Sequence, residues 1–354
     1  MNVAEDLKLH LLSQGLRITD RARHRITEGG SLPVSLHDYV TTSGVILKLP
    51  GEVYVNAPTD DAFCASSPYS LDSSDSELNL VGPSGVLPVE HVPIPAYVLE
   101  NNRDGLPFRG FAITHTDRVR AAPVAGCAFR CAFCDLPYTY AYTTKRIEHL
   151  VEAVQAGLHD RILPARHVLV SGGTPRAQDR EYLLKSLRAI CRSTDAPVDA
   201  MLVPWHDPDF LVRLRDSGID GVFFNLELYG ETAARQMMPQ KASFGNSALL
   251  ETLRRAVPVF GERKVRSLIL AGLEPVSDTL RGVEAIVSVG AIPILSPFRP
   301  SSATPLRNVP PPTLEVLKEA YTGALTISRR FGLPLGPDCI PCQHNTLAFP
   351  SSLQ

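Results

Sequence analysis

The stretch Gly126-Cys127-Ala128-Phe129-Arg130-Cys131-Ala132-Phe133-Cys134 contains three cysteines with the spacing C-x3-C-x2-C and an aromatic residue before the last cysteine. Thiolates bind zinc and iron–sulfur clusters, so cysteines at such short spacing predict a metal centre. Three thiolates on one loop can hold three irons of a 4Fe–4S cube and leave the fourth iron open to a small molecule. An open coordination position indicates chemistry rather than a structural role. The alternative is a zinc site completed by His115 or Asp135.

The sequence after this loop alternates between strand and helix patterns. Short apolar segments predict strands, and between them apolar residues recur at helical spacing, as in residues 147–158 and 183–191. Regular alternation predicts a parallel sheet with helices outside, and right-handed crossovers curl that sheet into a barrel. Six units rather than eight predict an α/β fold with a partial (β/α)6 TIM-like barrel. The predicted strands are Val119–Ala122, His167–Val170, Val198–Val203, Gly221–Leu226, Val265–Leu270 and Ile292–Leu295.

Three regions of the chain are predicted. Residues 116–331 form the barrel, residues 1–115 an N-terminal extension of short strands with a loop that carries Cys64, and residues 332–354 a C-terminal tail. Residues 62–110 are rich in Ser, Pro, Asp and Gly, which predicts mostly loop. We expect both extensions to cover the mouth of the barrel, where the loops after the strands carry the reactive groups.

Composition and charge exclude several classes of protein. Of the 354 residues, 44% are hydrophobic and 20% charged, so disordered, collagen-like and coiled-coil structures fit poorly. The net charge of −2 provides no general attraction for nucleic acid or an anionic membrane. No apolar stretch approaches the roughly 20 residues of a membrane-spanning helix, and the N-terminus lacks the features of a signal peptide. The seven cysteines argue against a disulfide framework, because their number is odd, so we expect a soluble, cytoplasmic protein.

The cysteine motif and its barrel resemble the radical S-adenosylmethionine (SAM) enzymes, whose signature is C-x3-C-x-aromatic-C after the first strand of a six-unit barrel. The resemblance covers about residues 116–331. It implies that Cys127, Cys131 and Cys134 bind a 4Fe–4S cluster and that SAM chelates the open iron. One electron, supplied by a reductase or a flavodoxin- or ferredoxin-type donor, then cleaves SAM to methionine and a 5′-deoxyadenosyl radical. The radical abstracts hydrogen from a small-molecule substrate.

The same resemblance implies a set of SAM-binding residues. The turn of Ser171, Gly172, Gly173 and Thr174 resembles the GGE-type segment that meets the SAM amino group, with Thr174 in place of the usual acid. The signature aromatic residue is Phe133. The alternative for the turn is an ordinary strand-to-helix connection, which also favours Gly-Gly.

Later strand ends carry three further implied contacts. Asn225 and Glu227 resemble the Asn-x-acid pair that meets the ribose hydroxyls of SAM in biotin synthase and lipoyl synthase. The segment 270–274 resembles the one that packs on adenine, with Gly272 and Leu273 at its centre. Arg235 or Lys241 could pair with the SAM carboxylate. A helix N-terminal acid and a solvated surface charge are the structural alternatives for these groups.

One arginine is a candidate for the substrate. The segment Pro297-Phe298-Arg299-Pro300 resembles the sixth-strand region of biotin synthase relatives, which directs Arg299 toward the substrate chamber. A purely structural arginine is the alternative.

A second cysteine pair lies in the C-terminal tail. Cys339 and Cys342 form a C-x2-C half-site between Pro and Gly residues, which is typical of zinc or an iron–sulfur cluster. Cys191 completes the apolar face of a helix, whereas Cys64 lies in a loop. We therefore predict an auxiliary iron–sulfur cluster on Cys64, Cys339 and Cys342, with His344 or an exogenous group as fourth ligand. A zinc half-site and a redox pair are the alternatives.

The auxiliary cluster leads to a prediction about the reaction. In biotin and lipoyl synthases, which the barrel motifs resemble, such a cluster is the source of sulfur. Radical-mediated sulfur insertion into a small metabolite is therefore the first hypothesis. The second is dehydrogenation, epimerisation or rearrangement, with the extra cluster as an electron conduit or substrate anchor. The third is a metal-stabilised binding protein without catalysis.

Overall fold

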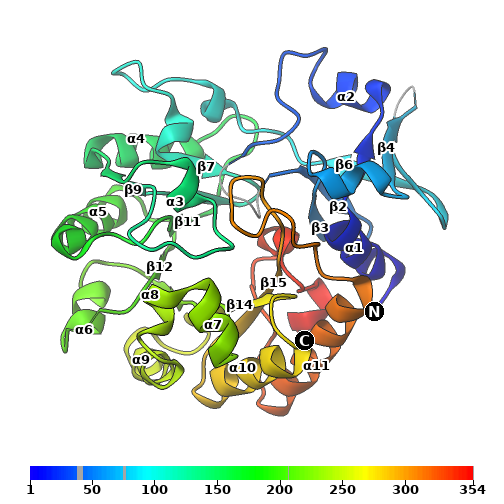
Figure 1. The fold of residues 1–354 in the computed structure, drawn as a ribbon. Helices are drawn as coiled ribbons and strands as arrows, with labels where there is room; N and C mark the ends of the chain where they lie inside the picture. Colours follow the sequence, from blue (N-terminus) through cyan, green and yellow to red (C-terminus); the bar gives the residue numbers. More distant parts are fainter. Residues whose placement is uncertain (38–42, 75–76, 206, 354) are drawn as a thin grey trace.

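A curved sheet of seven strands forms the centre of the region from residue 112 onward (Figure 1). The computed structural model describes residues 1–37, 43–74, 77–205 and 207–353. The strand order is β15-β14-β13-β12-β11-β8-β7. All neighbours are parallel except β7, which pairs antiparallel with β8 at one edge. The strands are β7 (Ala112–Thr114), β8 (Arg118–Ala121), β11 (His167–Val170), β12 (Val198–Leu202), β13 (Gly221–Phe224), β14 (Val265–Ala271) and β15 (Ile292–Pro297).

Helices follow the parallel strands and surround the sheet on its outer side (Figure 1). Each long helix buries one apolar face, as Leu184 and Leu187 do in the second of them. The predicted six-unit partial barrel is therefore confirmed. The long helices are α4 (Ile147–Leu158), α5 (Arg180–Ser193), α9 (Asn246–Phe260), α10 (Val276–Ser288) and α11 (Leu314–Arg330), and the shorter ones are α3 (Leu136–Thr139), α6 (Phe210–Arg215), α7 (Glu231–Met237) and α8 (Pro239–Ala242).

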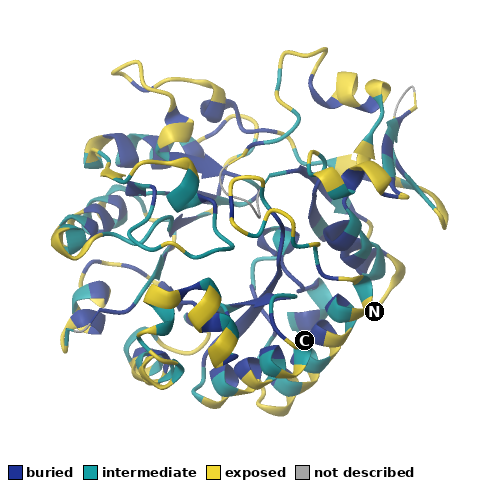
Figure 2. Ribbon diagram, in the orientation of Figure 1, coloured by how far each residue is buried: buried dark blue, intermediate teal, exposed yellow. Residues whose placement is uncertain are grey.

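The barrel strands are buried on both faces. Every residue of β13 and of β15 is buried, and Figure 2 shows buried residues along the strands with exposed residues at the periphery. Parallel strands covered on both faces need near-continuous apolar runs. This is why these segments were recognisable as strands without an alternating pattern.

A second, mixed sheet lies in the N-terminal extension, with the order β1-β4-β5-β6-β2-β3. The expectation that residues 62–110 are mostly loop is corrected in part, because three strands of this sheet lie there. Leu71, Leu80 and Val89 turn inward, while the Ser and Asp residues that suggested a loop occupy other positions of short strands. The elements are α1 (Val3–Gln14), β1 (Arg17–Ile18), α2 (Asp20–Ile26), β2 (Val45–Leu49), β3 (Val53–Ala57), β4 (Ser70–Ser73), β5 (Leu78–Gly82) and β6 (Gly85–His91).

The C-terminal tail connects the two ends of the open barrel sheet. It runs beside β15, where the Leu347 amide donates to the Leu295 carbonyl at 2.8 Å. Its short 3-10 helix η6 (Pro341–Asn345) packs against β3 and brings the cysteine pair to the N-terminal ends of β8 and β11. The tail therefore lies at the end of the barrel opposite its mouth, which differs from the expected position.

A fully buried lysine fixes the tail to the first helix. Lys8 Nζ donates to the carbonyls of Gln343 and Ala348 at 2.7 and 2.8 Å, and it lies 5.1 Å from the centroid of the Phe349 ring. Burial lowers the pKa of Lys8 well below its usual value.

Among the described residues, no helix has both the length and the apolar character to cross a membrane.

Candidate active site

The three-cysteine loop leaves the sheet after β8 and is closed at its base by a short strand pair. β9 (Val124–Ala125) pairs antiparallel with β10 (Thr143–Thr144). Gly126 then turns the chain with a φ of +62°, and a Cβ at this position would lie 2.6 Å from the carbonyl oxygen of Tyr140. Only glycine combines this left-handed conformation with such a close approach. The glycine thus fixes where the cysteine loop starts.

The Gly-Gly turn after β11 docks directly onto the cysteine loop. Cys127 Sγ accepts hydrogen bonds from the amides of Phe129 at 3.3 Å and Thr174 at 3.1 Å, and the Ala128 amide donates to the Thr174 carbonyl at 2.9 Å. A Cβ on Gly173 would lie 1.7 Å from the carbonyl oxygen of Gly126. The turn therefore requires glycine for contact between two loops of the protein itself. Two backbone amides thus point at this sulfur and fix its position at the start of the loop.

The other two cysteines of the loop are held in a drier environment. Burial raises the pKa of Cys131 to about 12, and it also raises the pKa of Cys134. The charge of Cys127 raises the pKa values of Cys131 and Cys134 further, and the charge of Cys131 also raises that of Cys134, because the thiols lie near one another. A bound cation reverses this preference for the protonated thiol, because it deprotonates its thiol ligands. Three neighbouring thiols, one of them with amide donors, fit the ligand set of a site-differentiated iron–sulfur cluster.

A buried carboxylate lies at the end of β13. Glu227 Oε1 accepts a hydrogen bond from Lys241 Nζ at 3.0 Å and from Asn225 Nδ2 at 3.3 Å, and the Glu227 and Lys241 side chains are 15% and 11% exposed. Glu227 adopts a φ of +64°, which is unfavourable for a residue with a side chain. Its backbone is held by bonds to Leu268 and Leu270 of β14. Such a conformation persists where surrounding structure over-determines it, which is common at binding sites.

These groups share one cavity of about 190 Å³ inside the barrel. Its lining includes Cys134, Phe133, Ser171, Gly172, Asn225 and Glu227 at one end and Cys342 at the other. Apolar side chains from four strands form the wall between the two ends: Met201, Phe223, Leu268 and Ile294. The structure thus brings part of the implied SAM-binding set and the tail cysteine to the same chamber.

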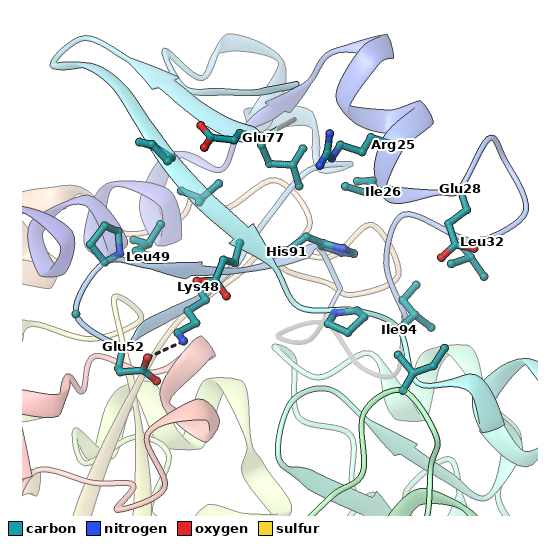
Figure 3. A pocket seen from close by; sticks show the side chains of 18 residues that line it. Arg25, Ile26, Glu28, Leu32, Lys48, Leu49, Glu52, Glu77, His91 and Ile94 are labelled. Carbon is teal, nitrogen blue, oxygen red and sulfur yellow. Dashed lines mark ion pairs between the residues drawn. The ribbon is translucent and has the colours of Figure 1, made fainter. Parts of the chain in front are cut away.

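A larger cavity of about 740 Å³ lies in the N-terminal extension (Figure 3). Lys48, Glu52 and His91 line it, and Lys48 forms an ion pair with Glu52 at 2.6 Å. None of the predicted site residues lines this cavity. We therefore place the active site in the smaller chamber, which holds the cysteines.

Two arginines that line the chamber were missed by the sequence reasoning. Arg118 and Arg120 are both on β8 and both line the cavity. The pattern Arg-Val-Arg contained the signal, because alternate residues of a strand face the same side. A buried strand with two arginines on one face indicates an anion or a polar partner in the barrel interior.

Some predicted residues lie outside the chamber or have protein partners. Arg235 is 72% exposed and pairs with Glu231 one helical turn away. Gly272, at φ +100°, faces Pro312, and a Cβ there would lie 2.6 Å from the proline Cβ. Leu273 packs in the same apolar cluster as Phe133 and Cys131. Of the two cations considered for the SAM carboxylate, only Lys241 reaches the Asn225–Glu227 group.

Arg299 lines the chamber, but its donors are engaged by the N-terminal extension. Its Nε and Nη2 donate to Asp61 Oδ2 at 2.8 and 2.5 Å, and its Nη1 donates to the Ser43 carbonyl. The Arg299 side chain is 9% exposed and that of Asp61 is 23% exposed. This pair fixes the extension to the loop after β15, at the mouth of the barrel. The contacts favour the structural interpretation of this arginine.

The replacement Arg299→Met is expected to lower the free energy of unfolding by roughly 3 kcal/mol, because it leaves Asp61 without its buried partner. The matched control is Arg254→Met, which breaks an exposed pair with Glu251 and should cost less than about 0.5 kcal/mol. Chemical denaturation monitored by circular dichroism measures both. Equal stability of the two variants would show that the Arg299–Asp61 pair does not hold the extension.

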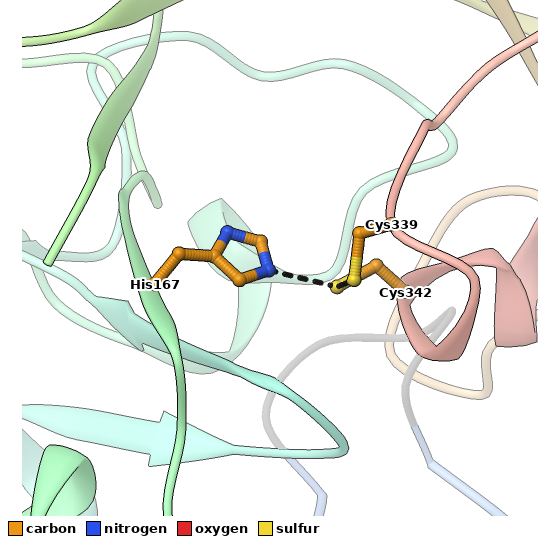
Figure 4. A group of neighbouring side chains, drawn as sticks. All are labelled: His167, Cys339 and Cys342. Carbon is orange, nitrogen blue, oxygen red and sulfur yellow. Dashed lines mark hydrogen bonds between the residues drawn. The ribbon is translucent and has the colours of Figure 1, made fainter.

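The predicted auxiliary ligands are only partly brought together. Cys64 is buried against Gly15 at the end of α1, and burial raises its pKa to about 11. Cys339 and Cys342 instead meet His167, the first residue of β11 (Figure 4). Cys64 is not part of this group, and His344 is buried behind it with a pKa lowered by burial. His167 was missed because it was assigned only to a strand.

Comparison with known proteins agrees with this site. Residues 122–280 match the family model described as the radical SAM superfamily, which includes the cysteine loop, the Gly-Gly turn and Glu227. The matched segment is similar to the radical SAM superfamily, and that similarity implies a 4Fe–4S cluster and SAM as cofactors. The predicted closer relation to biotin and lipoyl synthases stays a prediction.

The relatives of this radical SAM domain are distant. A bacteriochlorophyllide c C-7(1)-hydroxylase from Chlorobaculum limnaeum is 30% identical over 150 residues, which are 41% of this chain and 37% of that protein. The FeFe-hydrogenase maturase HydG from Carboxydothermus hydrogenoformans is 16% identical with a TM-score of 0.50, over 60% of this chain and 52% of that chain. Methylornithine synthase (PylB) is 16% identical with a TM-score of 0.48, over 59% and 61%. The chain thus spans little more than a third of the curated relative, and the likeness to HydG shows the fold alone.

Proposed function

We propose that this protein cleaves SAM reductively and abstracts a hydrogen atom from a small molecule held in the barrel chamber. The observation that carries the proposal is the single chamber lined by Cys134, the Gly-Gly turn and the Asn225–Glu227 pair. When bound, the cluster and SAM together supply a 5′-deoxyadenosyl radical, with the electron coming from an external donor. The protein's own residues bind and orient SAM and the substrate, and they shield the radical from water.

The polar residues of the chamber have distinct roles in this proposal. The Glu227 carboxylate accepts hydrogen bonds from the ribose hydroxyls of SAM, and Asn225 beside it donates or accepts. The Lys241 ammonium, 3.0 Å from Glu227, pairs with that carboxylate and orients it. The backbone of Ser171 and Gly172 borders the SAM amino group. The apolar wall excludes water, which protects a radical from side reactions.

The direct test is SAM cleavage by anaerobically reconstituted protein. With dithionite as reductant, we expect 5′-deoxyadenosine and methionine in about equal amounts, as the one-electron cleavage requires. With a candidate substrate deuterated at the reacting carbon, we expect deuterium in the 5′-deoxyadenosine. If protein with a complete cluster forms no 5′-deoxyadenosine under these conditions, the proposal fails and a metal-stabilised binding protein is favoured.

The variant Glu227→Gln is expected to weaken SAM binding about tenfold, because a hydrogen bond to a charged group contributes about 1.5–3 kcal/mol and tenfold corresponds to about 1.4 kcal/mol. Arg235→Gln is the control, since this arginine is 72% exposed and pairs with Glu231. We expect the control to change the dissociation constant less than twofold. Equilibrium dialysis with labelled SAM measures both, and a larger effect from Arg235→Gln would reverse the assignment.

The second part of the proposal concerns the reaction that the substrate radical undergoes after hydrogen abstraction. Sulfur insertion requires a sulfur donor, which is the role predicted for an auxiliary cluster on Cys64, Cys339 and Cys342. Rearrangement needs only hydrogen abstraction and its return, epimerisation needs a hydrogen donor to the substrate radical, and dehydrogenation needs an acceptor for one further electron and a proton. Hydroxylation, named for the Chlorobaculum relative, would need an oxygen source and an electron acceptor as well. Iron and sulfide counts test for the second cluster: about seven or eight irons per chain would support two cubes, as sulfur insertion requires, and about four would remove the auxiliary cluster and favour a simpler reaction.

A further inference from the structure

The C-terminal cysteine pair and His167 form a compact group of ligand atoms. Cys342 Sγ lies 3.3 Å from His167 Nε2 and 2.7 Å from Cys339 Sγ, and all three ligand atoms lie within 4.8 Å of one another. In Figure 4 the imidazole of His167 points at the two sulfurs, which come from the opposite side of the site. Neither cysteine is in a disulfide.

The separations match one metal ion better than a cluster. A zinc ion with Zn–S of about 2.3 Å and Zn–N of about 2.0–2.1 Å draws tetrahedral ligand atoms to roughly 3.5–3.8 Å from one another. Ligands of an iron–sulfur cube each bind a different iron and must therefore lie farther apart. The three atoms here need to separate only slightly to accept a single ion. Two thiolates and an imidazole are also a preferred zinc donor set.

We propose that His167, Cys339 and Cys342 bind a single zinc-type ion that holds the tail across the end of the barrel opposite its mouth. His167 opens β11, whereas the two cysteines come from the tail, where Cys342 follows His167 by 175 residues in the sequence. A shared ion therefore joins the barrel sheet to the tail that connects its open ends. This inference does not rest on the proposed radical chemistry.

The described surroundings supply three protein ligands and no fourth one. Asp117 is the nearest carboxylate, with Oδ2 3.4 Å from Cys339 Sγ, but its two oxygens are bound by Arg166 at 2.6 and 2.7 Å. Among the described residues, no further His, Cys, Asp or Glu joins the group of three. Arg118 and Arg166 lie close enough to stabilise two anionic sulfurs. Because Cys342 also lines the chamber, the ion borders the interior of the barrel.

The test is the metal content of the full chain, measured by mass spectrometry of the dissolved metals. For the wild type we expect about four irons and about one zinc per chain. A Cys127→Ala/Cys131→Ala/Cys134→Ala background should lose the iron and keep the zinc. In that background, His167→Ala and Cys342→Ser should lower zinc at least fivefold, whereas Cys64→Ser should retain it. Circular dichroism verifies that each variant is folded.

A second measurement does not depend on any variant. Titrating wild-type protein with a mercurial that blocks thiols should release about one zinc per chain, and Co²⁺ bound in its place should show thiolate charge-transfer absorption. Three results would each overturn the proposal: iron and sulfide that depend on Cys339 and Cys342, a metal-free Cys339–Cys342 disulfide, or zinc lost with Cys64→Ser but kept with His167→Ala. Failure here leaves 5′-deoxyadenosine formation unaffected, so it is distinguishable from failure of the proposed function.

Discussion

The triple replacement Cys127→Ala/Cys131→Ala/Cys134→Ala is expected to abolish the 4Fe–4S cluster and reduce 5′-deoxyadenosine formation to the background without enzyme. All three thiols lie on one loop beside the chamber, and three cysteine ligands are the minimum that holds a cube with an open iron. We expect the loss of about four irons and about four sulfides per chain. Iron and sulfide assays on anaerobically purified protein, followed by a SAM cleavage assay, measure both effects.

The matched control for this variant is Cys191→Ala. Cys191 is also a free, half-buried cysteine, but it lies on α5 with its Cβ 3.0 Å from the position of a Cβ on Gly218. Its replacement should leave the iron content and SAM cleavage unchanged, at a cost of no more than about 1 kcal/mol in stability. Full iron content in the triple variant would show that the cluster is bound elsewhere.

The second large effect is expected for Gly173→Ala. The new methyl group would lie 1.7 Å from the Gly126 carbonyl oxygen, and because the methyl is fixed to its own backbone and the carbonyl is itself backbone, one of the two loops must move. That movement removes the Thr174 amide from Cys127 Sγ, where the bond is 3.1 Å long. We expect iron content to fall by more than half and stability to fall by about 1–3 kcal/mol, as for an overpacked core.

Gly110→Ala controls for the general effect of replacing a glycine. A Cβ at Gly110 has nothing within 4 Å, and its φ is not positive. Iron analysis and thermal denaturation of the two variants, prepared side by side, should therefore distinguish the effect of the close loop contact at Gly173 from the general effect of replacing a glycine. Wild-type iron content in Gly173→Ala would mean that the two loops do not need to touch for cluster binding.

The barrel could be predicted from the sequence because its signals are local. Segments such as Gly221–Phe224 and 268–271 are continuous apolar runs, which parallel strands covered on both faces require. Apolar residues at helical spacing, such as Leu183, Leu184 and Leu187, marked the helices between them. The cysteine spacing is likewise local, and it is sufficient to indicate the superfamily.

The contacts that the sequence did not reveal join residues far apart in the chain. Arg299 pairs with Asp61 across 238 residues, and His167 meets Cys342 across 175. In neither pair does the local sequence around one residue indicate the other residue. Arg299 was therefore expected at the substrate, and Cys64 was expected beside the tail cysteines. The three strands within residues 62–110 were missed for a related reason: short strands rich in Ser, Pro and Asp are stabilised by pairing with distant strands rather than by local propensity.

The most direct test of the central claim is electron paramagnetic resonance of the reduced protein before and after SAM is added. If three thiolates leave one iron open, the reduced protein should give a 4Fe–4S signal whose g values change when SAM binds that iron. The signal should disappear in the triple cysteine variant. Colourless anaerobic protein that holds zinc at residues 127–134, or a signal that SAM does not alter, would contradict the account.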